Sequence, residues 1–178
     1  MSGWKPGDRR VATESMIRVD QAGEYGATRI YAGQLAVMGD RSAAARAIAG
    51  MARQEERHRA FFDRMIVERG VRPTLLQPFW NLAGFALGAA TAAIGPEAAM
   101  ACTAAVETEI DKHYADQLRE LGSDDPELSG AVAEFQAEEL EHRDTALASG
   151  AENAPAYPLM SAAIRFGCRA AIALAKRI

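Results

Sequence analysis

Apolar side chains recur at steps of three and four residues along most of the chain, which is the spacing of one face of an α-helix. Over residues 9–38, Ile17, Tyr31 and Leu35 fall on one such face together with Glu24. The pattern predicts a long first helix that carries an acidic residue among its apolar ones.

Capping and turn residues divide the following sequence into further helices. Ser42 is a typical N-cap and Gly70 a typical helix end, while Pro96 and Pro126 are each placed to open a helix. They predict three more helices: residues 42–69, 96–121 and 126–149. Because the connections are short, neighbouring helices should run antiparallel. The predicted fold class is therefore all-α, an up-down four-helix bundle within one domain, 1–178.

Two further segments, residues 79–94 and 157–178, are predicted as accessory apolar or amphipathic helices outside the four. No charged residue stands between Arg72 and Glu97. A helix over 79–94 would span roughly 24 Å, short of the roughly 30 Å hydrocarbon core of a bilayer. The segment is then either a buried core helix, a helix in the membrane interface, or the wall of an apolar substrate channel.

The C-terminal segment carries basic residues on one helical face. Arg165, Arg169 and Lys176 are separated by four and seven residues, so they share that face. A basic amphipathic helix can rest on an anionic membrane surface, and it can equally be a solvated surface helix. The sequence leaves both interpretations open.

Composition and charge narrow the class of protein. The chain has 178 residues, 49% of them apolar, and a net charge of −4, so no basic field favours nucleic acid as a partner. Cys102 and Cys168 have no metal-ligand or CxxC spacing and are expected to be structural thiols in a reducing compartment. The polar N-terminus lacks the apolar stretch of a signal peptide, so we expect a bacterial cytoplasmic protein or a trimmed organellar one.

Two of the three histidines follow a glutamate by three residues. These are the pairs Glu55 with His58 and Glu139 with His142. Residues three apart on a helix share a face, so each pair offers one oxygen and one nitrogen ligand in the same direction. One such pair is a weak signal, but two evenly spaced pairs are a strong one.

Two lone glutamates complete the pattern. Glu24 lies 31 residues before Glu55, and Glu107 lies 32 residues before Glu139, so the motif is stated twice with an offset of 83 to 84 residues. One Glu from each of two helices and one Glu-x-x-His from each of the others is the ligand layout of ferritin-like di-iron and di-manganese bundles. We therefore predict a ferritin-like di-metal centre. Its ligands are Glu24, Glu55, His58, Glu107, Glu139 and His142.

Neighbouring polar residues are assigned by their angle around the helix. Glu109 lies about 200° from Glu107 and should face away from the metals. Tyr114 could orient a ligand as a supporting residue of the catalytic centre, as could Tyr31, and an ordinary core tyrosine is the alternative for each. Two more residues, Asp111 and His113, are candidates for supporting roles. Three others are predicted to be off the ligand face: Glu56, Glu138 and Glu141.

At these residues the chain resembles the demethoxyubiquinone hydroxylase family of ubiquinone biosynthesis. The resemblance extends beyond the ligands to segments along nearly the whole chain: Arg18–Ala27, Arg29–Gln34, Arg72–Thr74, Gly84–Gly88, Ala99–Thr103, Glu138–His142 and Ala154–Tyr157. It implies that the six ligand positions bind two iron ions (Fe²⁺). None of the six departs from the family pattern.

The resemblance also implies a reaction, partners and a location. The reaction is an O₂-dependent monooxygenation of a polyprenylated demethoxyubiquinone or its quinol, with NADH as a reductant. The implied partners are the quinone substrate, an accessory protein of ubiquinone biosynthesis, and a second copy in a homo-oligomer. The implied location is peripheral, on the cytoplasmic face of the bacterial inner membrane or the matrix face of the mitochondrial one.

Other functions use similar ligands. A ferritin-type iron-binding or ferroxidase protein is the main alternative, but it would not need the charge-free strip beside the bundle. A lipid-binding helical scaffold would not need six evenly spaced ligands. Other di-metal enzymes share the ligand logic without the flanking motifs, and the ligand set alone would accept iron or manganese.

Overall fold

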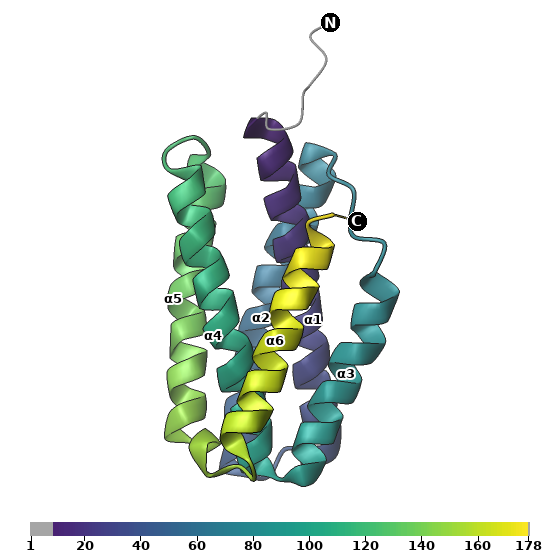
Figure 1. Cartoon of the computed structure of the whole chain (residues 1–178), viewed down its shortest axis with the longest axis vertical. Helices are drawn as coiled ribbons and strands as arrows, with labels where there is room; N and C mark the ends of the chain where they lie inside the picture. The colour runs from purple at the N-terminus through teal and green to yellow at the C-terminus, as the bar shows by residue number, and fades with distance from the viewer. Residues whose placement is uncertain (1–8, 178) are drawn as a thin grey trace, which may run out of the picture.

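The structure is a computed structural model that describes residues 9–177, so the last residue of the predicted segment 157–178 lies outside it. The described residues form helices and no strands, which confirms the all-α class (Figure 1). The elements are α1 (Arg9–Met38), α2 (Ala43–Arg69), α3 (Gln77–Ile94), α4 (Pro96–Leu121), α5 (Pro126–Ala148), the 3₁₀ turn η1 (Ala151–Asn153) and α6 (Tyr157–Ala175).

The four long helices α1, α2, α4 and α5 make the bundle, with α1 packed on α2 and α4 packed on α5. The predicted caps set their ends. The Ser42 side chain accepts a hydrogen bond from the backbone N–H of Ala45 at 3.0 Å, and Gly70 ends α2 with a left-handed φ of 63°. The Asp125 carboxylate accepts from the N–H of Leu128 at 3.1 Å and caps α5. These local bonds explain why the sequence predicted the helix limits well.

The core has two apolar clusters, one toward each end of the bundle. One contains Ile48, Met51 and the alanines that open α4, and the other contains Phe62 and Phe135. The six predicted ligands come from the helix turns between the two clusters. A polar layer therefore lies across the middle of an otherwise apolar core.

Helix α3 lies along α1 with backbone against backbone (Figure 1). A Cβ atom added at Gly88 would lie 1.9 Å from the carbonyl oxygen of Ile30, and one added at Gly33 would lie 2.1 Å from that of Phe85. Only glycine permits so close an approach. Since Phe79 and Leu82 are more than half exposed, α3 is not the buried core helix that one interpretation of residues 79–94 proposed.

Helix α6 runs along α4 and also touches α1. Its outer face is apolar and exposed, with Leu159 and Phe166 about 70% accessible. By length and composition alone, α6 could cross a membrane, and it is the one helix among residues 9–177 that could. Its two arginines, Arg165 and Arg169, bind Glu109 on α4. The basic residues are therefore neither purely solvated nor wholly available to a membrane.

Candidate metal centre

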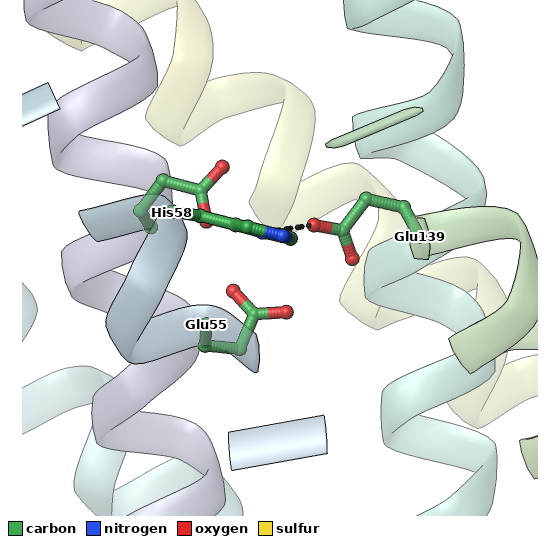
Figure 2. A group of neighbouring side chains, drawn as sticks. Glu55, His58 and Glu139 are labelled. Atoms are coloured by element: carbon green, nitrogen blue, oxygen red, sulfur yellow. Dashed lines mark hydrogen bonds and ion pairs between the residues drawn. The ribbon is translucent and has the colours of Figure 1, made fainter. Parts of the chain in front are cut away.

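The six predicted ligands meet in the middle of the bundle, each with at most 2% of its surface exposed. Helices α1 and α4 each contribute the lone glutamate, and α2 and α5 each contribute a Glu-x-x-His pair. Figure 2 shows Glu55 and His58 facing Glu139 across the space between α2 and α5. The two halves of the sequence motif therefore converge on one place.

The ligand atoms form two overlapping groups, each within 4.8 Å. One group adds Glu24 and His58 to the shared carboxylates Glu55 and Glu139, and the other adds Glu107 and His142 to the same two. Two overlapping groups of four ligands would suit a pair of cations, one held by each group. The structure thus shows which ligands the two groups share, which the sequence did not.

Like charges crowd this layer. Burial raises the pKa of Glu55 and of Glu107 well above the usual range, and neighbouring carboxylates, Glu139 first, raise both further. Burial also raises the pKa of Glu139. Four carboxylates in a dry core repel one another unless protons or cations neutralise them. The layer is therefore an attractive place for positive charge.

The pKa values of the two histidines shift in opposite directions. Burial disfavours the charged form of His58, but hydrogen bonds to Glu139 and Glu24 prevail and raise its pKa to about 10. Burial lowers the pKa of His142. Each histidine turns Nδ1 toward the carboxylates, with His58 Nδ1 3.1 Å from Glu139 Oε1 and His142 Nδ1 3.0 Å from Glu139 Oε2. Nδ1 is thus the ligand atom that each ring presents.

The carboxylates also have buried oxygens that a bound metal could satisfy. Glu55 Oε2 and Glu107 Oε2 are buried and accept no hydrogen bond from any residue that the structure describes. Glu24 Oε2 and Glu55 Oε1 face histidine Nδ1 atoms at 3.4 and 3.2 Å. A buried acceptor without a partner is costly. Carboxylate oxygens with imidazole nitrogens are a donor set that iron and manganese accept. The residues present therefore fit a di-metal centre.

A tyrosine reaches each lone glutamate from the opposite half. The Tyr31 hydroxyl donates to Glu107 Oε1 at 2.7 Å, and the Tyr114 hydroxyl donates to Glu24 Oε1. Both tyrosines are about 1% exposed. Each follows its own glutamate by seven residues in sequence but contacts the other one. The sequence identified both residues, and the structure adds that the contacts cross between α1 and α4.

The outer nitrogen of each histidine also has a partner. His58 Nε2 lies 2.8 Å from Glu138 Oε2, and His142 Nε2 lies 2.8 Å from Gln54 Oε1. Glu138, predicted to be off the ligand face, belongs to neither ligand group but contacts the histidine on the facing helix, a pairing that the sequence did not predict. Gln54 was missed. Its signal was its position just before Glu55, as Glu138 stands just before Glu139.

Two other candidates have different roles from the metal ligands. His113 Nε2 lies 2.9 Å from Asp20 Oδ1, and the Gln117 amide donates to Asp20 Oδ2 at 2.7 Å. Burial raises the pKa of Asp20. Asp111 accepts a hydrogen bond from Gln136 at 2.7 Å, so it ties α4 to α5 rather than orienting a ligand.

A largely apolar cavity of about 440 Å³ adjoins the metal layer. It lies between α1, α3, α4 and α6, so both accessory helices form walls of it. Gly23 and Val106 line it, and each is the sequence neighbour of a predicted ligand. At the α3 wall stands Trp80, whose buried Nε1 donates to none of residues 9–177. The charge-free strip is thus the wall of an apolar cavity.

Known proteins are similar over nearly the whole chain. The family described as Ubiquinone biosynthesis protein COQ7 matches residues 11–175. A 3-demethoxyubiquinol 3-hydroxylase of Rhodospirillum rubrum is 52% identical over 175 residues, covering 97% of this chain and 82% of the relative. An NADPH-dependent 3-demethoxyubiquinone 3-hydroxylase, mitochondrial, of Mus musculus is 52% identical over 172 residues, covering 94% and 79%. The 5-demethoxyubiquinone hydroxylase, mitochondrial, of Saccharomyces cerevisiae is 42% identical over 181 residues, covering 93% and 78%.

Proposed function

Because the chain belongs to the family of the ubiquinone biosynthesis protein COQ7, we propose that it is a demethoxyubiquinone hydroxylase. It is an enzyme, an oxidoreductase that adds a hydroxyl group to the ring of a demethoxyubiquinone or its quinol. The observation that carries the proposal is the convergence of six buried ligands beside an apolar cavity. A metal layer alone would equally suit an iron-storage protein, whereas the adjoining cavity suits an enzyme with an apolar substrate.

The ligands would hold two iron ions. Glu24 and His58 would hold one ion and Glu107 and His142 the other, and Glu55 and Glu139 belong to both groups of ligands. Bound iron supplies the redox chemistry that activates O₂. The chain's own part is to orient the ligands: Glu138 and Gln54 fix the histidine rings, while Tyr31 and Tyr114 fix the lone glutamates.

The substrate would lie in the cavity between α1, α3, α4 and α6. Its lining is dominated by small and branched apolar residues, which accept a polyprenyl tail and exclude water. Gly23 and Val106 stand where the cavity approaches the ligands, so the ring would enter at that point. Water exclusion there favours transfer of oxygen to the ring over side reactions.

Overall, a ring C–H becomes C–OH, one oxygen atom of O₂ enters the product, and the other leaves as water with two electrons from a reductant. NADH is our proposed electron donor. The name of the mouse relative specifies NADPH, so both reduced nicotinamides should be compared. The sequence contains no GxGxxG dinucleotide-binding motif, so it does not indicate which of the two is used.

We also propose that the protein works at a membrane surface, on the cytoplasmic face of a bacterial inner membrane or the matrix face of a mitochondrial one. Exposed apolar side chains support this on both accessory helices, with Phe79 and Leu82 on α3 and Leu159 and Phe166 on α6. A polyprenyl quinone resides in lipid, so an enzyme taking it up must contact lipid. An accessory protein of ubiquinone biosynthesis and a second copy of the chain remain further proposed partners.

The test combines metal content with turnover. Wild-type protein should bind about two irons and hydroxylate a short-tailed demethoxyquinone with O₂ and a reduced nicotinamide. Glu139→Ala should lose both irons and product, because Glu139 belongs to both ligand groups. Glu141→Ala, an exposed neighbour on the same helix, should change neither.

The outcomes separate the parts of the proposal. Bound iron without hydroxylated product would support the metal centre but contradict the proposed substrate. That result would favour a ferritin-type role. Full iron content in Glu139→Ala would overturn the ligand assignment. No bound metal in the wild type would overturn the di-iron centre itself.

A further inference from the structure

One buried carboxylate ties helix α6 to the bundle in addition to the apolar contacts of that helix. Glu109 on α4 is 4% exposed, and its Oε1 lies 2.6 Å from Arg165 Nε and 3.2 Å from Arg169 Nη1, both on α6. Lys112 on α4 also reaches this oxygen, at 3.2 Å. Since α6 contains no acidic residue of its own, these bonds to α4 balance its charge.

The same helix is a wall of the cavity. Ile164, Cys168 and Ala175 line it, and α6 contributes seven of the nineteen lining residues. Displacing α6 from α4 would therefore open the cavity along one side. Apolar contacts also hold α6: Ile164 and Cys168 meet Cys102 and Val106 on α4. At the other end of the helix, Ala175 packs with Val19 and Ala22 on α1.

The start of α6 is a strained joint. Ala156, its N-cap, has φ 52° and ψ 36°, and is the one non-glycine residue with positive φ in the range 9–177. A left-handed conformation costs a residue with a Cβ about 1 kcal/mol. Such strained residues are found at segments that switch between arrangements.

The arginines can be reached from outside. The side chains of Arg165 and Arg169 are 35% and 53% exposed, although Glu109 is buried. Leu159, Phe166 and Leu174 are exposed on the same helix, so lipid contact through them would bring phosphate groups to the level of the arginines. Guanidinium groups bind phosphate in the same bidentate geometry as carboxylate.

We propose that Glu109 is a releasable latch that holds α6 across the cavity, and that anionic phospholipid headgroups open it by competing for Arg165 and Arg169. The inference rests on the proposed function, in that it assumes an apolar substrate enters this cavity from lipid. In this proposal Glu109 positions α6 as a wall of the cavity and takes no part in the metal layer. Entry is then confined to protein that has docked on an anionic surface.

Cys168 reports the state of the latch without reference to catalysis. It lines the cavity, and burial raises the pKa of its thiol to about 12, so it should react slowly with N-ethylmaleimide while α6 is in place. Opening exposes the thiol and speeds the reaction. The adduct is located by peptide mass spectrometry, which separates Cys168 from the fully buried Cys102.

In the experiment, full-length protein is labelled alone, with phosphatidylcholine vesicles, with vesicles that also contain phosphatidylglycerol, and with inorganic phosphate. The anionic vesicles should accelerate labelling of wild-type Cys168 about tenfold, and the other conditions should not. Glu109→Gln should label at the faster rate in buffer alone. Glu120→Gln removes the same charge at an exposed position of the same helix and should label at the wild-type rate.

Arg165→Gln provides a second route to the open state and guards against a folding defect in Glu109→Gln. Equal labelling of wild type with neutral and anionic vesicles would overturn the role of headgroups. Acceleration by inorganic phosphate alone would overturn the requirement for a lipid surface. Equal rates in wild type, Glu109→Gln and Arg165→Gln would overturn the latch. Because labelling needs neither metal nor quinone, failure of the proposed function would appear separately, as missing iron or product.

Discussion

The two accessory helices form walls of one cavity but are attached in opposite ways. Helix α3 meets α1 through glycines, with added Cβ atoms at Gly33 and Gly88 colliding with facing backbone. Helix α6 meets α4 through small apolar contacts and the ion pairs of Glu109. One attachment depends on close backbone packing, and the other combines apolar contacts with ion pairs.

The difference predicts different mobility. Backbone-to-backbone packing has a single close-fitting arrangement, because any shift along it creates clashes or gaps. Half-exposed ion pairs can exchange one partner for another with little loss of free energy. The cavity thus has a fixed wall and a releasable one, and three substitutions test this comparison.

The largest effect is expected from Gly88→Ala in the fixed wall. Its Cβ would lie 1.9 Å from the Ile30 carbonyl oxygen, so α1 and α3 must separate, and we expect the free energy of unfolding to fall by about 3 kcal/mol. Denaturant unfolding at matched metal content measures it. Gly130→Ala is the control, since no atom lies within 4 Å of its added Cβ. Equal stability of the two variants would contradict a shape-determined wall.

A smaller effect is expected from Arg165→Gln combined with Arg169→Gln. Both side chains are about a third exposed or more, so the loss in unfolding free energy should stay below about 1 kcal/mol. Locally the change should be clear: backbone amides of α6 should exchange hydrogen faster, while those of α3 keep their rates. If α3 and α6 amides accelerate together, the two walls open as one unit and the comparison fails.

The smallest effect, with the opposite sign, is expected from Gly167→Ala on α6. No atom lies within 4 Å of the added Cβ, so the substitution should stabilise the helix by about 0.5 kcal/mol. Gly84→Ala on α3 is the matched comparison, because its Cβ would lie 3.0 Å from the Gly26 carbonyl oxygen. Thermal unfolding of the pair should move in opposite directions. A loss of stability in Gly167→Ala would show that α6 is packed as tightly as α3.

Much of the fold was predictable because its signals are local. Ser42, Gly70 and Pro126 act within one turn of the helix ends that they set. The residues of the metal layer could also be predicted, because helical geometry alone places Glu55 and His58 on one face. The assignment of ions to that layer stays a prediction.

What escaped prediction depends on contacts between helices. Glu109 was correctly placed away from Glu107's face, but the helical angle cannot say that α6 covers it. The contact of Glu138 was missed for the same reason, because its partner His58 is on α2. The sequence left two environments open for Arg165, a membrane surface or solvent. The structure shows a third, an ion pair with Glu109 within the chain.

Under the proposed function, the length of the cavity determines how much of the substrate's polyprenyl tail leaves the lipid. Its lining runs from Val19 to Ile30 on α1 and from Ala163 to Ala175 on α6, about 18 Å at 1.5 Å per residue. A lining of that length accommodates only a few isoprene units. We therefore expect turnover to depend on the isoprene units nearest the ring, which would lie in the cavity. Units beyond the cavity would stay in the bilayer, and lengthening the tail there should not change turnover.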